Sequence, residues 1–213
     1  MSDPFYRFIR FSGSHVFWLS SRSTVIGVAH TRRPGPFILA ATHSSPYDVP
    51  LLIRHTPPML DFVSITEVFK NPLVAWFYGS LNAFPLERSR PDAPAVRVIL
   101  DRLKRGRVVA MFPEGRICKG PASVVHSRRI RPGIGRIAQL ANVPIVPVVI
   151  VNSGAYSRFS SWLPLRRVRY GLVYGEPISP DGEPEWIEQR LIEAFVSLHA
   201  ELVRKMPTVA IPN

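Results

Sequence analysis

The sequence predicts a single α/β domain in which a largely parallel central sheet is flanked by helices. The chain has 213 residues, 46% of them hydrophobic, so it is long and apolar enough to bury a core. Short apolar runs alternate with amphipathic stretches, and several runs are apolar on both faces. Strands of that kind are typical of parallel sheets covered by helices on both sides.

Six segments are predicted as strands because each is a short apolar run bounded by turn-forming residues. They cover residues 37–42, 60–65, 81–86, 108–112, 145–151 and 168–174. Four segments between or after them are predicted as helices, at residues 72–78, 93–104, 134–141 and 185–205. In the second of these, Val96, Ile99 and Leu103 share one face and Gly106 follows as a stop signal.

The N-terminal residues 5–19 are rich in aromatic side chains, with Arg7 and Arg10 among them. This composition fits a helix that lies in a bilayer interface, and it fits equally a terminal helix that packs on the domain. No run of about 18 uncharged apolar residues occurs, so no membrane span is expected. We expect one domain over residues 1–213, with a membrane-associating segment at 1–30 and an α/β core at 35–206.

The charge balance predicts an anionic partner, because 27 Lys and Arg residues face 15 Asp and Glu residues, a net charge of +12. Nucleic acid, anionic lipid and phosphorylated substrates all remain open on this ground. The single cysteine, Cys118, excludes an intrachain disulfide. Residues 115–120 have the glycine spacing of a phosphate loop but lack the Lys and Ser/Thr that bind phosphate and magnesium. No G-x-S-x-G is present, so a serine hydrolase is not indicated. No paired Cys/His spacing indicates a zinc site.

Polar side chains follow three predicted strands at the points where those strands end. His43 and Asp48 follow the first, Arg88 follows the third, and Glu114 and Arg116 follow the fourth. A carboxylate near a histidine can hold one imidazole nitrogen, so that the other takes a proton from a substrate hydroxyl. Arginine offers a planar set of donors that suits phosphate. Sites are built at the carboxyl edge of such sheets, so these clusters are candidates to converge.

Four blocks of the sequence resemble those of the glycerolipid acyltransferases, the lysophosphatidic acid acyltransferase family. The H-x-x-x-x-D block, usually with Ser two residues after the His, is matched by His43, Ser45 and Asp48. F-P-x-x-R is matched at residues 84–88, F-P-E-G at 112–115 and V-P-I-V-P-V at 143–148, all in the family's order. The sequence departs from the family at Thr42, where Asn is common, and at Arg116, where Thr is usual. Similar E-G-R-I forms occur in members that act on larger head groups.

The resemblance implies an enzyme that moves a fatty acyl chain from acyl-CoA or acyl-carrier protein to a hydroxyl of a lysophospholipid. Lysophosphatidic acid, giving phosphatidic acid, is the default acceptor. His43 is then the general base and Asp48 orients it, while Glu114 is expected to hold a glycerol hydroxyl or to position an arginine. The substrate-binding residues that the resemblance implies are Ser45, Arg88, Phe112, Pro113, Glu114, Gly115 and Arg116. No metal and no cofactor beyond the acyl donor are implied.

The expected partners are an anionic phospholipid surface, the acyl donor and a lysophospholipid, with the protein peripheral or monotopic at the cytoplasmic face of a membrane. Other acceptors stay open: lysophosphatidylethanolamine, glycerol phosphate or an acylated amino acid lipid. A basic nucleic-acid-binding module without catalysis is the alternative from another class. Against specific nucleic-acid binding, the arginines form no single long run and no known reader motif is present.

Overall fold

The structure is a computed structural model that describes residues 3–65, 84–86, 93–165 and 168–206. The first half contains α1 (Asp3–Ser20), β1 (Ser21–Ile26), η1 (Val28–Thr31), β2 (Ile38–Ala41), α2 (Asp48–His55), β3 (Leu60–Ile65), β4 (Phe84–Leu86) and α4 (Ala93–Lys104). The second half contains β5 (Val108–Met111), η3 (Gly120–Ala122), α5 (Val124–Ser127), α6 (Ile134–Ala141), β6 (Ile145–Val151), η4 (Ser153–Ser157), η5 (Phe159–Trp162), β7 (Val168–Tyr174) and α7 (Pro184–Lys205).

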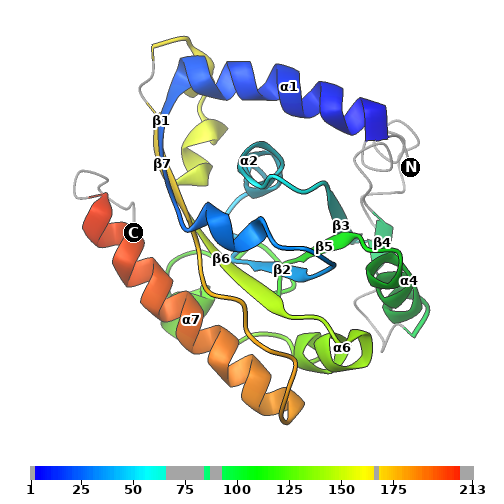
Figure 1. Ribbon diagram of the computed structural model, residues 1–213. Helices are drawn as coiled ribbons and strands as arrows, with labels where there is room; N and C mark the ends of the chain where they lie inside the picture. The colour runs from blue at the N-terminus through cyan, green and yellow to red at the C-terminus, as the bar shows by residue number, and fades with distance from the viewer. Residues whose placement is uncertain (1–2, 66–83, 87–92, 166–167, 207–213) are drawn as a thin grey trace.

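Within the described residues, one seven-stranded sheet runs in the order β1-β7-β6-β2-β5-β3-β4. All neighbouring strands are parallel except β6 and β7, which are antiparallel. Helices α1 and α2 cover one face of the sheet, and α4, α6 and α7 cover the other (Figure 1). The predicted fold class, α/β with a largely parallel sheet between helices, is therefore confirmed.

Alternate residues along the strands supply the two halves of the core. In β2, Leu39 and Ala41 pack toward α1 and α2, whereas Ile38 and Ala40 pack toward the helices of the opposite face. This is the two-residue period of a strand, and all four side chains are completely buried. Full burial of an aliphatic side chain contributes about 1.5–3 kcal/mol, so the apolar β-runs are the main source of cohesion between the layers.

Most of the predicted elements are found with their boundaries shifted by no more than a residue. The helices at 93–104 and 134–141 agree with the structure, and the last helix begins at Pro184, a residue type favoured in the first helical turn. Strands β2 and β5 are each shorter than predicted, ending at Ala41 and Met111. The predicted helix at 72–78 and residues 81–83 of the third predicted strand lie outside the described residues.

Strand β1, like α2, was not predicted from the sequence, and it lies within the stretch 1–30 that was expected to be a membrane-associating segment. Residues 21–26 pair in parallel with β7, so they belong to the sheet of the core and not to a separate N-terminal segment. Their sequence, SRSTVI, is largely polar because β1 is an edge strand with only partly covered faces. Edge strands do not need the two apolar faces by which central strands are recognised.

Helix α1 packs on the domain. This was one of the two interpretations that the sequence left open for the N-terminal segment. Its Tyr6 and Phe17 are buried in the core. The Tyr6 hydroxyl accepts a hydrogen bond from the N–H of Leu60 at 3.2 Å, and burial raises the pKa of Tyr6 to about 12. Arg10 donates to the carbonyl of Pro57 at 2.7 Å.

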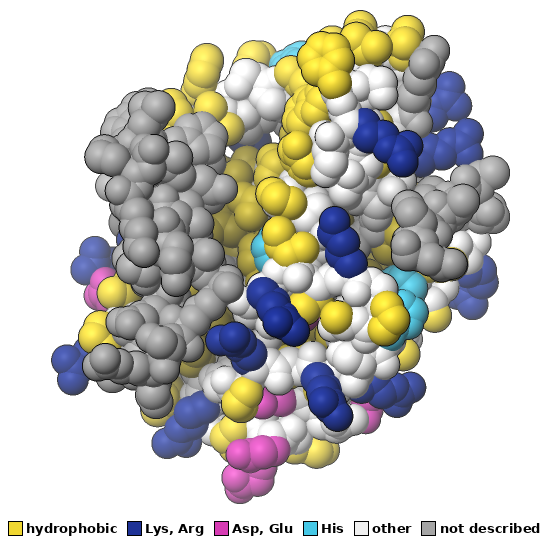
Figure 2. Space-filling model, turned by 180° about the vertical axis from the view of Figure 1, so that it is seen from behind, with side chains coloured by type: hydrophobic (Ala, Val, Ile, Leu, Met, Phe, Trp, Pro, Cys, Tyr) yellow, Lys and Arg dark blue, Asp and Glu magenta, His cyan; other side chains and the backbone are white. Residues whose placement is uncertain are grey.

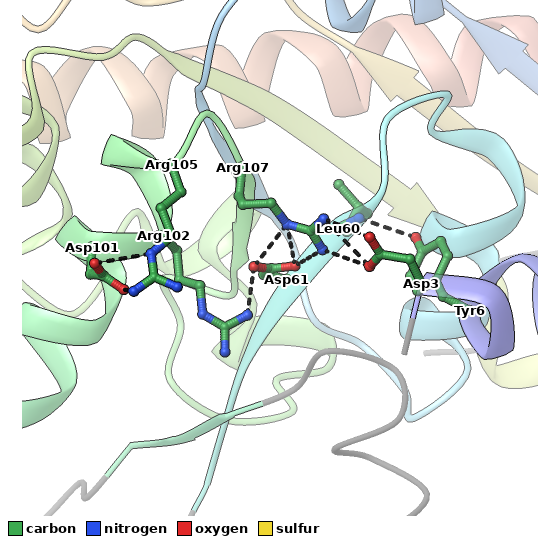
Figure 3. A network of polar contacts seen from close by, with 8 residues as sticks. All are labelled: Asp3, Tyr6, Leu60, Asp61, Asp101, Arg102, Arg105 and Arg107. Carbon is green, nitrogen blue, oxygen red and sulfur yellow. Dashed lines mark hydrogen bonds and ion pairs between the residues drawn. The ribbon is translucent and has the colours of Figure 1, made fainter. Parts of the chain in front are cut away.

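A buried carboxylate joins the start of α1 to the sheet (Figure 3). Asp61 of β3 is fully buried and accepts hydrogen bonds from Arg102 at 2.7 Å and from Arg107 at 2.6 Å. Arg107 also lies 3.4 Å from Asp3 in the first turn of α1. Because two guanidinium groups share the charge of Asp61, the carboxylate is not left unpaired in the interior, which would cost several kcal/mol.

No helix in the described parts of the chain has the length and apolar character needed to cross a membrane.

Candidate active site

Two of the polar clusters predicted from the sequence meet at one edge of the sheet. Strands β2 and β5 are parallel neighbours, so the loops that follow them leave the same edge. His43 lies in the first loop and Glu114 in the second, and the N–H of His43 donates to Glu114 Oε2 at 2.6 Å. The segment after β6 reaches the same place, because the hydroxyls of Ser44 and Ser153 lie 3.2 Å apart. This carboxyl edge is where open α/β sheets build their sites.

His43 and Asp48 form a hydrogen-bonded pair. Nδ1 of His43 lies 3.0 Å from Oδ2 of Asp48, which is fully buried, while the His43 side chain is 16% exposed. The same Asp48 oxygen accepts from the backbone N–H groups of Ser44 at 2.7 Å and Ser45 at 2.9 Å. Asp48 begins α2, where the helix dipole stabilises its negative charge. A carboxylate bonded at Nδ1 leaves Nε2 of the neutral imidazole as the atom available to take a proton.

The ring of His43 is also held from one side by an aromatic neighbour. Phe112, the first residue after β5, stacks on it with ring centroids 4.0 Å apart and planes 20° from parallel. The carbonyl of His43 accepts a hydrogen bond from the N–H of Cys118 at 2.8 Å. The backbone and the side chain of His43 are therefore both held in place by contacts within the protein.

Glu114 bridges two loops through backbone amides. Its Oε2 accepts from His43 as described, and its Oε1 accepts from the N–H of Val124 at 2.8 Å. Burial raises the pKa of Glu114, and the two backbone donors act in the opposite direction. This placement differs from the sequence expectation that Glu114 holds a glycerol hydroxyl or positions an arginine. Both carboxylate oxygens of Glu114 instead accept backbone N–H groups of the protein itself, and so hold two loops together.

The remaining predicted residues of the F-P-E-G-R block shape the loop after β5. Pro113 is buried, and its carbonyl accepts from the N–H of Arg131 at 2.8 Å. Gly115 has φ of +69°, a left-handed conformation that favours glycine, and the Arg131 side chain lies where a Cβ would stand. Arg116 is exposed beside this turn. Arg131 was not predicted from the sequence, because no local pattern connects it to a loop 16 residues earlier.

Two other residues were predicted for the site, Ser45 and Arg88. Ser45 is buried, and its hydroxyl oxygen accepts from the N–H of Tyr47 at 3.0 Å, so its visible role is to shape the turn that leads into α2. Arg88 lies outside the described residues. Among the residues that are described, no group of three or more His, Cys, Asp and Glu side chains is placed to hold a metal ion.

An apolar pocket of about 300 Å³ lies between α1 and α2, next to the loop that carries His43 and Asp48. Ile9, Gly13 and Phe17 of α1 line one side. The opposite side is formed by Pro46, Tyr47, Val49, Pro50 and Ile53. Because Pro46 and Tyr47 connect Ser45 to Asp48, the turn between His43 and Asp48 forms part of the pocket lining.

Comparison with known proteins identifies relatives of this chain. The sequence model of the family described as Acyltransferase matches residues 22–151. A 1-acyl-sn-glycerol-3-phosphate acyltransferase of Bacillus subtilis (strain 168) is 28% identical over 144 residues, which are 67% of this chain and 66% of the relative. A protein of the same name from Streptococcus pneumoniae (strain ATCC BAA-255 / R6) is 29% identical over 144 residues, 67% of this chain and 50% of the relative. The chain thus spans less than two thirds of the length of these relatives.

A solved structure supports the same relationship at the level of the fold. The crystal structure of the 1-acyl-sn-glycerophosphate (LPA) acyltransferase PlsC from Thermotoga maritima superposes with a TM-score of 0.63. The match covers 92% of this chain and 80% of that one at 24% sequence identity. Since the family model spans more than half of the chain and includes the strand ends that carry His43, Asp48 and Glu114, the protein belongs to the acyltransferase family.

Proposed function

We propose that this protein transfers a fatty acyl group from a thioester donor, acyl-CoA or acyl-carrier protein, to a hydroxyl of a lysophospholipid. Lysophosphatidic acid is the proposed acceptor and phosphatidic acid the product, in keeping with the names of the relatives. The observation that carries the proposal is the pair formed by His43 and Asp48 at the carboxyl edge of the sheet, with Nε2 of His43 available as a base.

In the proposed reaction, Nε2 of His43 removes the proton from the acceptor hydroxyl as its oxygen attacks the thioester carbonyl. The oxygen–carbon bond forms, the carbon–sulfur bond breaks, and the thiolate leaves with a proton returned by the imidazolium. Asp48 stabilises that imidazolium through the contact at Nδ1. No protein nucleophile is needed, because the acceptor oxygen is itself the attacker.

The apolar pocket between α1 and α2 is the proposed place for part of an acyl chain. Its lining is mainly apolar and includes Pro46 and Tyr47, which lie in the turn between His43 and Asp48. Arg10 and Arg54 also line it, but each donates to a backbone carbonyl, of Pro57 and Ser14 respectively. Burial of methylene groups there contributes roughly 0.8 kcal/mol each, so a pocket of this kind favours chains that fill it.

The acceptor phosphate is proposed to contact arginines at the loop after β5. Arg116 is exposed next to Gly115, and Arg131 lies against the same glycine. The family resemblance adds Arg88. The net charge of +12 gathers phosphorylated substrates and draws the protein to anionic lipid.

We also propose that the outer face of α1 contacts the bilayer from which the acceptor comes. Phe8, Phe11 and Trp18 are exposed at helical spacing on this face, opposite the buried Tyr6 and Phe17. A helix with apolar side chains on its solvent face and Arg7 beside them is typical of an interfacial helix. Because Tyr6 and Phe17 belong to the core, point variants of the outer face test this better than removal of the helix.

The experiment that tests the function is lipid mass spectrometry after incubation of the purified protein with a mixture of lysolipids and acyl-CoA. His43→Ala should lower product formation by about 10²–10⁴-fold, the usual contribution of a general base. His126→Ala is the matched control, since His126 is exposed on α5 and its ring lies 6.0 Å from that of His199 on α7. Equal rates for His43→Ala and the wild type would refute the mechanism. The product with the highest rate identifies the acceptor head group.

A further inference from the structure

An exposed apolar segment follows β6 and lies beside the C-terminal end of α1 (Figure 1). It comprises residues 158–165, which are η5 with Arg158 before it and three residues after it. Its outward side chains include Phe159, Leu163 and Leu165. Phe159 is 86% exposed, more than any other large hydrophobic side chain in the described part of the chain. A monomeric protein rarely turns such a group of side chains to water unless the group meets a partner.

The segment is held firmly from its inner side, so the exposure of Phe159 is a property of a fixed structure. The indole N–H of Trp162 donates to the carbonyl of Tyr156 at 2.9 Å, and the hydroxyl of Ser161 donates to the carbonyl of Ala155 at 2.6 Å. The Trp162 ring packs 4.9 Å from that of Tyr156. The Ser161 hydroxyl and the Trp162 indole are thus bonded inward, while Phe159, Leu163 and Leu165 face outward.

The same indole connects the segment to both α1 and the active-site loop. Its centroid lies 5.6 Å from Phe17 of α1 and 5.7 Å from Tyr47, which stands between Ser45 and Asp48. The preceding η4 contributes Ser153, whose hydroxyl lies 3.2 Å from that of Ser44. Residues 158–165 therefore have a fixed position relative to the outer face of α1 and to His43.

Charge around this segment favours an anionic surface. Arg158 is exposed within it. The sequence between Glu114 and Glu176 carries ten Lys and Arg residues and no Asp or Glu, and the sequence between Asp3 and Asp48 likewise has no acidic residue. Figure 2 shows hydrophobic side chains gathered at the top of one face of the molecule, with Lys and Arg side chains beside and below them. Apolar groups bordered by cations match the interface of an anionic bilayer.

We infer that residues 158–165 are a second bilayer-contacting element, which inserts Phe159 and Leu165 into the interface of an anionic membrane while α1 contacts the same surface. This inference rests on the proposed action of the protein on a membrane lipid. Two separate contacts, one before β1 and one after β6, define a plane, whereas a single helix leaves the molecule free to rotate about its axis. The two contacts together set the direction in which His43 faces the lipid.

The test is binding to vesicles of phosphatidylglycerol mixed with phosphatidylcholine, measured by co-sedimentation of the full-length protein. Leu165→Ser and Leu140→Ser are a matched pair, because both leucines are 52% exposed and Leu140 lies on α6 at the opposite face of the sheet. Phe159→Ser should lower the partition coefficient about tenfold and Leu165→Ser about threefold to tenfold, with Leu140→Ser unchanged. Equal binding by Phe159→Ser and the wild type, or an equal loss with Leu140→Ser, would overturn the inference.

A second measurement places the residue directly. A polarity-sensitive fluorophore attached to Phe159→Cys should shift to shorter wavelength on addition of these vesicles, and the same dye on Leu140→Cys should not; the native Cys118 is buried. Identical responses at the two positions would exclude insertion. These readouts involve no turnover. Wild-type protein that binds vesicles through Phe159 but transfers no acyl group would refute the proposed function alone, while normal transfer without the Phe159 effect would refute this inference alone.

Discussion

The surroundings of Asp48 predict an unequal effect of two substitutions at that position. Its Oδ2 accepts three hydrogen bonds, from Nδ1 of His43 and from the N–H groups of Ser44 and Ser45. In Asp48→Asn, the two backbone donors select the orientation that places the amide oxygen where Oδ2 stands. That orientation still accepts from Nδ1, so the tautomer of His43 is kept. The negative charge is lost, and the NH₂ group takes the place of Oδ1, which is buried and has no hydrogen-bond partner.

The magnitudes follow from the kinds of hydrogen bond. A hydrogen bond to a charged group contributes about 1.5–3 kcal/mol and one between neutral groups about 0.5–1.5 kcal/mol. The difference of about 1–2 kcal/mol predicts a fall in kcat of roughly 5- to 30-fold for Asp48→Asn. Asp48→Ala removes the acceptor for two backbone N–H groups, with a cost of about 1–3 kcal/mol of stability for each, and releases the imidazole. Its kcat should fall by about 10²–10⁴-fold.

The assay is steady-state acyl transfer with urea unfolding of each variant in parallel. The expected order of activity is wild type, then Asp48→Asn, then Asp48→Ala, with a clear loss of stability only in the last. If Asp48→Asn were as inactive as Asp48→Ala while remaining as stable as the wild type, the amide would present its NH₂ group to His43. The argument that Ser44 and Ser45 fix the orientation would then be wrong.

Three further predictions concern groups around the site. Glu114→Gln should lower stability by about 1–3 kcal/mol in urea unfolding, because one of the two backbone donors on the carboxylate loses its acceptor; unchanged stability and kcat would show that the bridge does not hold the loops. Burial, followed by the charges of Arg54 and Arg10, lowers the pKa of His55 to about 3. Since the folded-state pKa is depressed, the contribution of His55 to stability is present above about pH 6.5 and is lost as pH falls toward 3, a loss of about 2 kcal/mol by pH 5. His55 Nε2 lies 2.8 Å from the Tyr170 hydroxyl. His55→Gln, which can still bond Tyr170, should flatten this part of the stability profile, and parallel profiles for the two proteins would contradict the assignment. Gly13→Leu should shift the preferred donor toward shorter acyl chains in a chain-length series, since Gly13 lines the pocket and has free space at its Cβ; an unaltered preference would place the chain elsewhere.

The sequence was sufficient to predict the parts of the fold that depend on local patterns. Strands β3, β6 and β7 are mainly apolar, and their bounds agree with those predicted. The spacing of His43 and Asp48 indicated their contact, because a strand end followed by a short turn returns the chain within five residues. These features are visible in sequence because the residues that create them are close together in the chain.

What the sequence did not predict depends on residues brought together from distant positions. The bonds of Glu114 to His43 and Val124 arise only once β2 and β5 lie side by side, so its charge alone favoured a substrate contact. The contact of Arg131 with Gly115 has the same origin. Strand β1 has no apolar signature because its exposed position at the sheet edge does not require one.

The pairing of β1 with β7 has a consequence for the order in which the protein folds during synthesis. Ser21 pairs with Val168, so in the described sheet the first strand to leave the ribosome has as its neighbour the last strand to be made. Closing a loop of that length is entropically costly and makes this pairing a late event. Until β7 is translated, the edge of β6 stays open, and open edges recruit other chains. Nascent chains that stop before residue 168 should therefore aggregate or bind chaperones, whereas chains that extend past β7 allow β1 and β6 both to pair with it.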